Sequence, residues 1–424
     1  MKHSLIRFLD RRIGTLLCAG LTSVRRLHEL IWRTRSASDK PKKILFIKWI
    51  EQGATVLAYG ALIRAIELVG KENVYFSVFD ENMAILELLD IIPRENILQL
   101  RNKKLTLFLL DMLKSLWKIR RLKIDATVDL EFFARASAVF GYLTGARIRV
   151  GLHRFASEAP YRGDLMTHRV QYNPYLHITM SYRLLVDALL KDPADQPMLK
   201  ATLPIELPQA KFLASEADLR QALIILQKFS SQPLNGQPII LLNPNASDLL
   251  PLRKWPTERF VALGLELLAR EPDAVLVLTG ASSEAAGAEH VMRELKSDRV
   301  FSIAGKTTLR ELIMIYSLAQ VLVTNDSGPA HFASLTPIAA VTLFGPETPK
   351  LFGAVAGDPH ILWAGLACSP CVSALNHRKS TCINNLCMQA IGVDDVASKV
   401  RELLARNRAS KSRPRFEEVR RRSG

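Results

Sequence analysis

Short apolar runs, separated by longer stretches of helical periodicity, make up most of the chain. Four β-rich runs lie in the first half: ILFIKW at 44–49, VYFSVF at 74–79, ATVDLEF at 126–132 and RIRVGL at 147–152. A second series follows: IILLNP at 239–244, AVLVLTG at 274–280, VLVTND at 321–326 and AAVTLFG at 339–345. Strands that alternate with helices are typical of parallel sheets in doubly wound α/β domains. The sequence therefore predicts an α/β protein with two Rossmann-like domains in tandem.

Changes in composition along the chain set the expected domain boundaries. With 424 residues, 48% of them hydrophobic, the chain is long enough for two cores. An N-terminal domain is expected at 43–205 and a C-terminal domain at 237–405, joined by a polar, Pro-containing connection at 206–236. Residues 1–42 are expected to form a basic amphipathic helix and a linker, and 406–424 a basic tail.

The first thirty residues have apolar side chains at helical spacing with arginines between them. This pattern predicts an amphipathic helix from Leu5 to Trp32, with a break near Gly14 or Gly20 as an option. A basic amphipathic helix can lie in the interface of a bilayer. Packing against the protein's own domain explains the same pattern, and the sequence leaves both interpretations open.

The formal net charge of +16 is concentrated at the two ends of the chain. Residues 1–43 contain eleven Lys or Arg and three acidic residues, a net charge of +8. Residues 401–424 contain nine Lys or Arg and three acidic residues, a net charge of +6, so the interior has a net charge of only +2. A nucleic-acid groove would carry its charge on the folded domain, so an anionic membrane surface is the better partner and no nucleic acid is expected. Without a long apolar span or a secretory cleavage pattern, the protein is expected in the cytoplasm.

Four of the five cysteines crowd one short segment. Cys368, Cys371, Cys382 and Cys387 have spacings that would suit a structural zinc knuckle, and reduced or locally paired thiols are the alternative. An odd number of cysteines arranged in this way does not form the disulfide framework of a secreted domain.

The strongest chemical motif is TNDSGPAH at 324–331, where a buried strand turns into a helix. The turn would present backbone N–H groups and the positive end of a helix dipole, and Gly328 would let the backbone approach a diphosphate closely. Asp326 and His331 would face the same pocket. Helix capping by Asp326 or Ser327 is the simpler explanation for one residue, although it does not account for the cluster.

Two further loops follow strands of the second series. The segment NPNASDLLPLRKWP leads into a helix that should start near Pro256, and Arg253 or Lys254 within it could pair with a phosphate. The segment TGASSE offers Glu284 to ribose hydroxyls. The segment AGKTT at 304–308 is not a Walker A motif, because Val300 stands where that motif needs glycine.

With these motifs the chain resembles glycosyltransferase family 9, the bacterial enzymes similar to ADP-heptose:lipopolysaccharide heptosyltransferases. The resemblance runs from about Lys43 to Arg406 and rests on TNDSGPAH, RKWP, AGKTTLREL at 304–312 and LFGPETP at 343–349. It implies a GT-B fold, in which two Rossmann-like domains face a cleft, and inverting transfer without a metal ion or cofactor. The resemblance also assigns donor-binding roles to Arg253, Glu284, Asp326, Ser327, Gly328 and His331.

The loop after the first strand departs from the family pattern. Members usually carry Gly-Asp there, and the Asp deprotonates the acceptor hydroxyl; this chain keeps Gly53 but has Ala54 at the Asp position. Glu51 is the nearest carboxylate and our candidate for the catalytic base, with a solvated loop acid as its alternative. Asp129 and Glu131 are less favoured substitutes.

Two histidines lie where the family approaches the acceptor, His168 and His177, although either could be bonded to the backbone instead. Together, the sequence predicts a glycosyltransferase that uses a nucleotide-sugar co-substrate, first of all ADP-heptose, and a lipopolysaccharide or other envelope glycan acceptor. It is expected as a peripheral protein on the inner face of the inner membrane. A non-catalytic sugar-nucleotide-binding relative, which Ala54 favours, and a GT-B epimerase are the alternatives.

Overall fold

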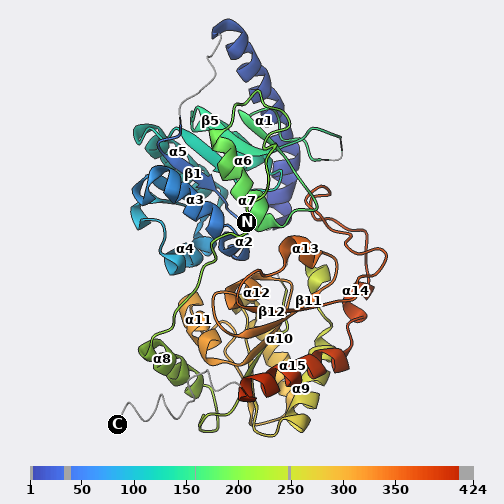
Figure 1. Ribbon diagram of the computed structural model, residues 1–424. Coiled ribbons are helices and arrows are strands. Elements are labelled where there is room, and N and C mark those ends of the chain that lie inside the picture. Colours follow the sequence, from blue (N-terminus) through green and yellow to red (C-terminus); the bar gives the residue numbers. More distant parts are fainter. Residues whose placement is uncertain (1–2, 33–39, 158, 247–249, 410–424) are drawn as a thin grey trace. The chain divides into compact units, whose positions relative to one another are not determined.

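The computed structural model describes the chain except residues 1–2, 33–39, 158, 247–249 and 410–424 (Figure 1). The chain divides into two compact units. Unit 1 comprises Met1–Gln209 and Ser373–Lys379, and unit 2 comprises Ala210–Val372 and Ser380–Gly424. Each unit has its own parallel sheet and its own apolar core.

The sheet of unit 1 has the strand order β3-β2-β1-β4-β5-β6, and all of its pairings are parallel. Its strands are β1 Ile44–Ile47, β2 Val74–Phe79, β3 Ile97–Leu100, β4 Ala126–Asp129, β5 Ile148–His153 and β6 His168–Gln171. The helices are α1 His3–Trp32, α2 Gln52–Leu57, α3 Tyr59–Val69, α4 Met83–Leu89, α5 Leu105–Arg121, α6 Arg135–Leu143 and α7 Ile178–Asp187. Short 3-10 turns are η1 Lys71–Asn73, η2 Asp80–Asn82, η3 Arg94–Asn96 and η4 Ala188–Leu190.

Unit 2 repeats this arrangement with the order β12-β11-β10-β7-β8-β9, again parallel throughout. Its strands are β7 Ile239–Asn243, β8 Val275–Leu278, β9 Val300–Ser302, β10 Val321–Asn325, β11 Ala339–Phe344 and β12 Asp358–Trp363. The helices are α8 Glu216–Gln227, α9 Thr257–Arg270, α10 Ala285–Leu295, α11 Leu309–Leu318, α12 Gly328–Ala333, α13 Pro349–Phe352, α14 Leu386–Gln389 and α15 Val393–Ala409. Two 3-10 turns, η5 Pro251–Arg253 and η6 Ser282–Glu284, follow β7 and β8.

These two sheets confirm the predicted doubly wound α/β class. Each of the eight β-rich runs contains a strand, and α9 begins at Thr257, directly after Pro256 as expected. The two sheets do not test the expected domain boundaries, which stay predictions. Of the expected basic tail at 406–424, residues 406–409 form the end of α15, and 410–424 lie outside the described residues.

The predicted N-terminal helix is present as α1, and it continues through Gly14 and Gly20 without a break. Its inner side packs on α6, where a Cβ atom on Gly14 would lie 2.8 Å from the Cβ atom of Arg135. Cys18 is buried there against Ala138, and Arg25 donates to Asp164 at 2.6 Å. The interpretation that this helix packs on its own domain is therefore confirmed.

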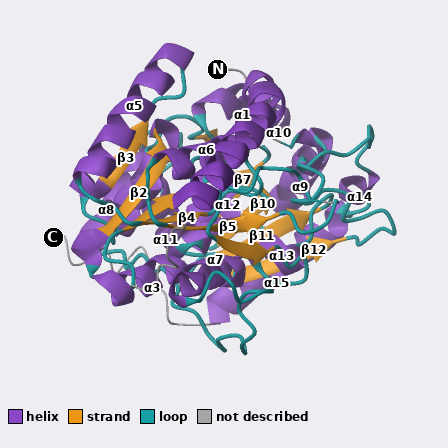
Figure 2. Cartoon of the chain, turned by 90° about the horizontal axis from the view of Figure 1, so that it is seen from above, coloured by secondary structure: helices purple, strands orange, loops and turns teal. Residues whose placement is uncertain are grey.

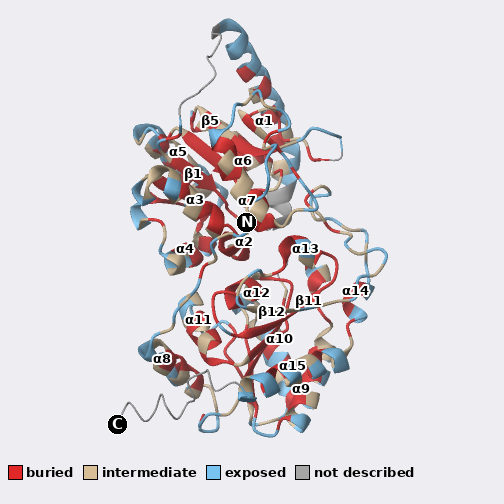
Figure 3. Cartoon of the chain, viewed as in Figure 1, coloured by how far each residue is buried: buried red, intermediate tan, exposed pale blue. Residues whose placement is uncertain are grey.

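The outer side of α1 is exposed (Figure 3) and carries large apolar side chains among its charged ones. Its exposed apolar residues are Phe8, Ile13, Leu16, Leu17, Val24, Leu27, Leu30 and Ile31. In the described part of the chain, no helix combines the length and apolar character that crossing a membrane requires. Membrane contact through α1 therefore stays a prediction, now with a defined set of side chains.

Candidate functional site

Four loops of unit 2 leave the sheet at the carboxyl ends of β7, β8, β10 and β11. In open parallel sheets this edge is where ligands bind. The loops after β7 and β10 carry the RKWP and TNDSGPAH motifs, and the loop after β11 carries GPET. The fold therefore gathers the motifs of unit 2 at one edge of its sheet.

Arg253 is the centre of a buried charge cluster at this edge. Its Nη1 lies 3.7 Å from Oδ2 of Asp326 and 3.4 Å from Oε2 of Glu347. The three residues are 8%, 3% and 1% exposed. Burying these charges is tolerated because one guanidinium faces two carboxylates. The Nε atom of Arg253 has no hydrogen-bond partner among the described residues, which leaves this donor for a ligand.

Asn325 joins the two main motifs of unit 2. Its Oδ1 accepts a hydrogen bond from the backbone N–H of Trp255 at 2.9 Å, and its Nδ2 donates to the carbonyl of Asn245 at 2.9 Å. The side chain is fully buried. Asn325 therefore fixes the loop after β7, and with it Arg253, against the end of β10.

We expect Asn325→Ala to lower the free energy of unfolding by about 2 kcal/mol, because it leaves one buried donor and one buried acceptor unpaired. Chemical denaturation followed by circular dichroism measures this change. The matched control is Asn235→Ala at an exposed position, which should change the free energy by less than about 0.5 kcal/mol. Equal effects of the two substitutions would contradict the role given to Asn325.

The turn between β10 and α12 differs from a simple helix cap. Ser327 precedes α12, yet its hydroxyl donates to the carbonyl of Asn325 at 3.1 Å, and no side-chain capping bond forms. Capping by Ser327 therefore does not explain the motif. Gly328 begins α12, and His331 is buried within it. The donor-binding roles of Asp326, Ser327, Gly328 and His331 stay predictions.

Lys254 and Glu284 take positions different from that of Arg253. Lys254 is half-buried, and its contact with this region is through its carbonyl, which accepts from Nδ2 of Asn385 at 2.9 Å. Of the two neighbouring basic residues, only Arg253 is placed in the carboxylate cluster.

The Glu284 carboxylate accepts from the backbone N–H of Ala281 at 2.8 Å. It thereby orders the turn after β8, and its contact with a ribose stays a prediction.

Glu347 also belongs to this cluster, and the sequence motifs alone do not single it out. It lies in the LFGPETP motif after β11, and its position there was the available signal. The sequence predicts that Arg253 meets a phosphate. That a second carboxylate is buried beside Arg253 follows only from the pairing of β10 with β11 in the folded sheet.

None of the four clustered cysteines forms a disulfide bond. Ser380 donates to Sγ of Cys371 at 3.2 Å, and burial raises the pKa of Cys387. Over the described residues, no group of three or more His, Cys, Asp or Glu side chains is arranged to hold a metal ion. The zinc alternative therefore has no ligand set in this arrangement.

The loop after β1 carries the candidate base of unit 1. Glu51 has φ 72° and ψ 92°, a backbone conformation that residues with side chains rarely adopt. Such strain persists only where surrounding contacts fix it, and it clusters at functional sites. The Glu51 side chain is 21% exposed, so it is held by protein contacts yet accessible to a ligand.

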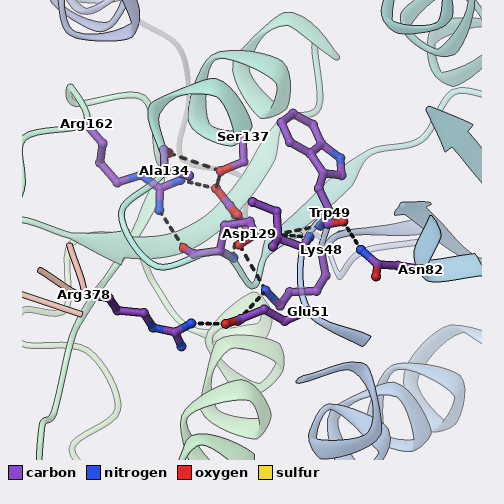
Figure 4. Close-up of polar contacts among 11 residues, drawn as sticks. Lys48, Trp49, Glu51, Asn82, Asp129, Ala134, Ser137, Arg162 and Arg378 are labelled. Atoms are coloured by element: carbon purple, nitrogen blue, oxygen red, sulfur yellow. Dashed lines mark hydrogen bonds and ion pairs between the residues drawn. The ribbon is translucent and has the colours of Figure 1, made fainter. Parts of the chain in front are cut away.

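Buried charges beneath the loop hold Glu51 in place (Figure 4). Lys48 donates to Oε2 of Glu131 at 3.1 Å and lies 3.6 Å from Oε2 of Glu51. Burial opposes the charge on Lys48, but Glu131 and the other facing groups outweigh it and raise the Lys48 pKa. The ammonium group of Lys48 thus lies between the Glu131 and Glu51 carboxylates.

The two substitutes for the base have structural contacts of their own. Glu131 accepts the backbone N–H groups of Trp49 and Ile50 at 2.7 and 3.1 Å. Asp129 accepts from Ser137 at 2.9 Å and forms an ion pair with buried Arg162. Both carboxylates are buried. Glu131 thus holds the start of the loop that presents Glu51, whereas Asp129 contacts Ser137 and Arg162 (Figure 4).

Arg378 completes this site from a distant part of the sequence. The segment Ser373–Lys379 groups with unit 1, and the Arg378 guanidinium forms an ion pair with Glu51 (Figure 4). Its Cζ also lies 5.8 Å from the ring centroid of Phe132, a cation–π contact. Nothing in the local sequence signals this contact, because 327 residues separate the partners.

The remaining candidates of unit 1 have local roles. Ala54, half-buried in α2, has no side-chain proton acceptor. His168 lies between Oγ1 of Thr167 and the carbonyl of Lys191, at 2.9 and 3.0 Å, and burial lowers its pKa. His177 caps α7, where its Nδ1 accepts from the N–H of Thr179. Both histidines thus follow the backbone-bonded alternative.

Comparisons with known proteins agree with this architecture. The solved structure of the Escherichia coli ADP-heptose lipopolysaccharide heptosyltransferase II superposes with a TM-score of 0.65, at 16% identity, over 86% of this chain and 99% of that one. A glycosyltransferase of family 9 from Veillonella parvula gives 0.63, also at 16% identity, over 88% and 100%. These likenesses confirm the predicted GT-B fold.

Sequence similarity to known proteins covers shorter segments of the chain than the structural similarity does. Lipooligosaccharide heptosyltransferase 2 of Haemophilus influenzae is 31% identical over 160 residues, 37% of this chain and 42% of that protein. The Campylobacter jejuni protein of the same name is 26% identical over 178 residues, 40% and 52% of the two chains. The matches thus span about half the length of these curated relatives. The model of glycosyltransferase family 9 (heptosyltransferase) matches residues 114–381, more than half of the chain, so the chain belongs to this family.

Proposed function

We propose that the protein is a glycosyltransferase that moves a sugar from a nucleotide-diphosphate donor to a lipopolysaccharide or other envelope glycan. Heptose is the first candidate for the sugar, and ADP-heptose for the donor. The observation that carries the proposal is buried Arg253, held between Asp326 and Glu347 at the ligand-binding edge of unit 2 in a chain of the heptosyltransferase family.

In this proposal Arg253 binds the diphosphate of the donor. A guanidinium is always charged, and its planar fork matches phosphate oxygens. When the bond between the anomeric carbon and the diphosphate breaks, the electron pair leaves with the diphosphate. Arg253 stabilises that charge, and the backbone N–H groups at the start of α12 assist it. The reaction then needs no metal ion for its leaving group.

Glu51 takes the proton from the acceptor in the same proposal. The acceptor oxygen attacks the anomeric carbon from the side opposite the diphosphate, which inverts the configuration there. Its proton passes to the Glu51 carboxylate as the new carbon–oxygen bond forms. Lys48 and Arg378 keep the carboxylate oriented, and the constrained backbone at Glu51 fixes its direction.

The test is a transfer assay with purified protein, a membrane extract that contains acceptors, and a panel of nucleotide sugars. We expect donor-dependent labelling of a glycolipid, with ADP-heptose the most active donor. Nucleotide binding without transfer would support the non-catalytic alternative, which Ala54 favours. Conversion of free nucleotide sugar in the absence of acceptor would support the epimerase.

The proposal includes a location at the cytoplasmic face of the inner membrane, with α1 in contact with the lipid. We expect Leu16→Gln/Leu27→Gln/Leu30→Gln to reduce binding to vesicles that contain phosphatidylglycerol about tenfold or more, since three exposed apolar side chains are lost. Co-sedimentation measures the bound fraction. All three side chains are exposed, so we expect the fold to be retained. Unchanged binding would remove α1 as a membrane contact.

A further inference from the structure

A second helix of unit 1 exposes an apolar face that the core does not use. Helix α5 buries Ile119 in the core beside β3, while its opposite side carries large apolar residues in solvent. Leu113 and Trp117 are each 64% exposed. The exposed apolar residues of α5 are Leu105, Leu109, Leu110, Leu113 and Trp117. Four of them recur every four residues and therefore form one stripe along the helix.

Positive charge surrounds this stripe. Residues 101–123 contain eight Lys or Arg and a single acidic residue, Asp111. Asp111 is buried, and its carboxylate accepts two hydrogen bonds from the Arg101 side chain, at 2.8 and 2.7 Å. The Arg101 guanidinium therefore neutralises the negative charge of Asp111. Arg121 lies over the ring of Trp117, with its Cζ 5.2 Å from the centroid.

Helices α5 and α1 lie over the same face of the sheet. Ile119 of α5 and Phe140 of α6 share one core cluster, which places both helices on one side. Helix α1 packs on α6, with Cys18 against Ala138. Figure 2 shows α1 and α5 on this same side of the strands of unit 1. The two helices expose their apolar residues from one face of the unit.

We infer that the outer face of α5 is a second contact surface for an anionic phospholipid bilayer. An amphipathic helix with an apolar stripe, flanking Lys and Arg, and Trp on the apolar side has the composition of an interfacial helix. A second copy of the chain fits less well, because symmetric pairing would bring two strongly basic faces together. The inference extends the proposed membrane location but rests on α5 itself, so it stands whether or not the chain transfers a sugar.

Contact through two helices would hold unit 1 in one orientation on the membrane. One interfacial helix supports the unit along a single line, whereas a second helix on the same face supports it over an area and restricts tilting of the unit. The carboxyl edge of the sheet, with Glu51, would then keep a constant direction relative to the lipid surface. This is what transfer to a lipid-linked acceptor requires.

The test uses the full chain and the variant Leu113→Gln/Trp117→Gln. The control variant, Ile224→Gln/Leu265→Gln, changes two exposed apolar residues on helices of unit 2. On vesicles of phosphatidylcholine mixed with phosphatidylglycerol, we expect the α5 variant to lose about tenfold or more in partition and the control to bind like the unchanged chain. Equal binding of all three proteins would overturn the inference.

A second measurement does not depend on weakened binding. Lipids with bromine in the upper acyl chain quench tryptophans that enter the interface. The comparison is made in Trp32→Phe, because Trp32 belongs to α1, the other proposed contact helix. We expect Trp32→Phe to be quenched and Trp32→Phe/Trp117→Phe, which keeps an apolar ring at 117, to lose most of this quenching. Quenching that persists in Trp32→Phe/Trp117→Phe would overturn the inference. So would a lipid-free dimer, seen by sedimentation velocity, that Leu113→Gln/Trp117→Gln converts to monomer, because the face would then pair two copies.

Discussion

Replacing Arg253 by Lys should raise the dissociation constant for ADP about 10- to 100-fold, while the same calorimetric titration of Lys254→Ala should give a value close to that of the unchanged chain. Arg253 alone of this pair is placed with Asp326 and Glu347, and lysine keeps the charge but loses the planar fork. A charged hydrogen bond to phosphate contributes about 1.5–3 kcal/mol, which corresponds to this range.

The choice of lysine at this position keeps the test interpretable. Arg253→Ala would remove the guanidinium that faces buried Asp326 and Glu347, and the loss of one partner from a buried ion pair costs about 3–5 kcal/mol of stability. A thermal melt of Arg253→Lys then checks that the fold is kept. Tighter or unchanged ADP binding by Arg253→Lys, or a larger loss in Lys254→Ala, would show that the diphosphate does not use Arg253.

Glu51→Gln should reduce turnover roughly 10²- to 10⁴-fold, the usual contribution of a general base, and leave the dissociation constant for ADP unchanged. Glutamine keeps the shape of the side chain and an oxygen that can accept from Lys48 and Arg378, but it cannot take up the proton. Initial rates at saturating donor and acceptor, together with ADP calorimetry, separate catalysis from binding.

The neighbouring residue supplies the control for Glu51. Gln52 begins α2 and donates to the carbonyl of Glu81, so Gln52→Ala changes the same loop without removing a carboxylate. We expect its turnover to stay close to that of the unchanged chain. If Glu51→Gln retains full turnover, another group accepts the proton; if Gln52→Ala loses as much, the loop matters through its shape alone.

The sequence predicts the inner strands of both sheets and misses the outer ones. The missed strands, β3, β6, β9 and β12, stand at the ends of the two strand orders. Edge strands are short or face solvent in part, so they lack a continuous apolar run. Strand β12, with Pro359 and a half-buried pattern, and β9, with three residues, show this clearly.

In the candidate site, residues within short motifs can likewise be predicted from the sequence, whereas contacts between distant segments cannot. Arg253 and Asp326 each lie in a compact motif after a strand, so the sequence alone nominates them. The contact of Arg378 with Glu51 depends on a segment that joins unit 1 only in the folded chain, so no local pattern predicts it. For His168 and His177 the sequence leaves two interpretations open, and the structure shows that both have backbone partners.

The central claim is that the carboxyl edge of unit 2 binds the diphosphate of a nucleotide sugar through Arg253. A crystal structure of the chain with ADP-heptose, or with ADP, tests it most directly. We predict a phosphate oxygen within hydrogen-bonding distance of the Arg253 guanidinium, and the diphosphate beside the turn at Ser327 and Gly328. A nucleotide bound elsewhere, with the contacts of Arg253 to Asp326 and Glu347 unchanged, would contradict the account.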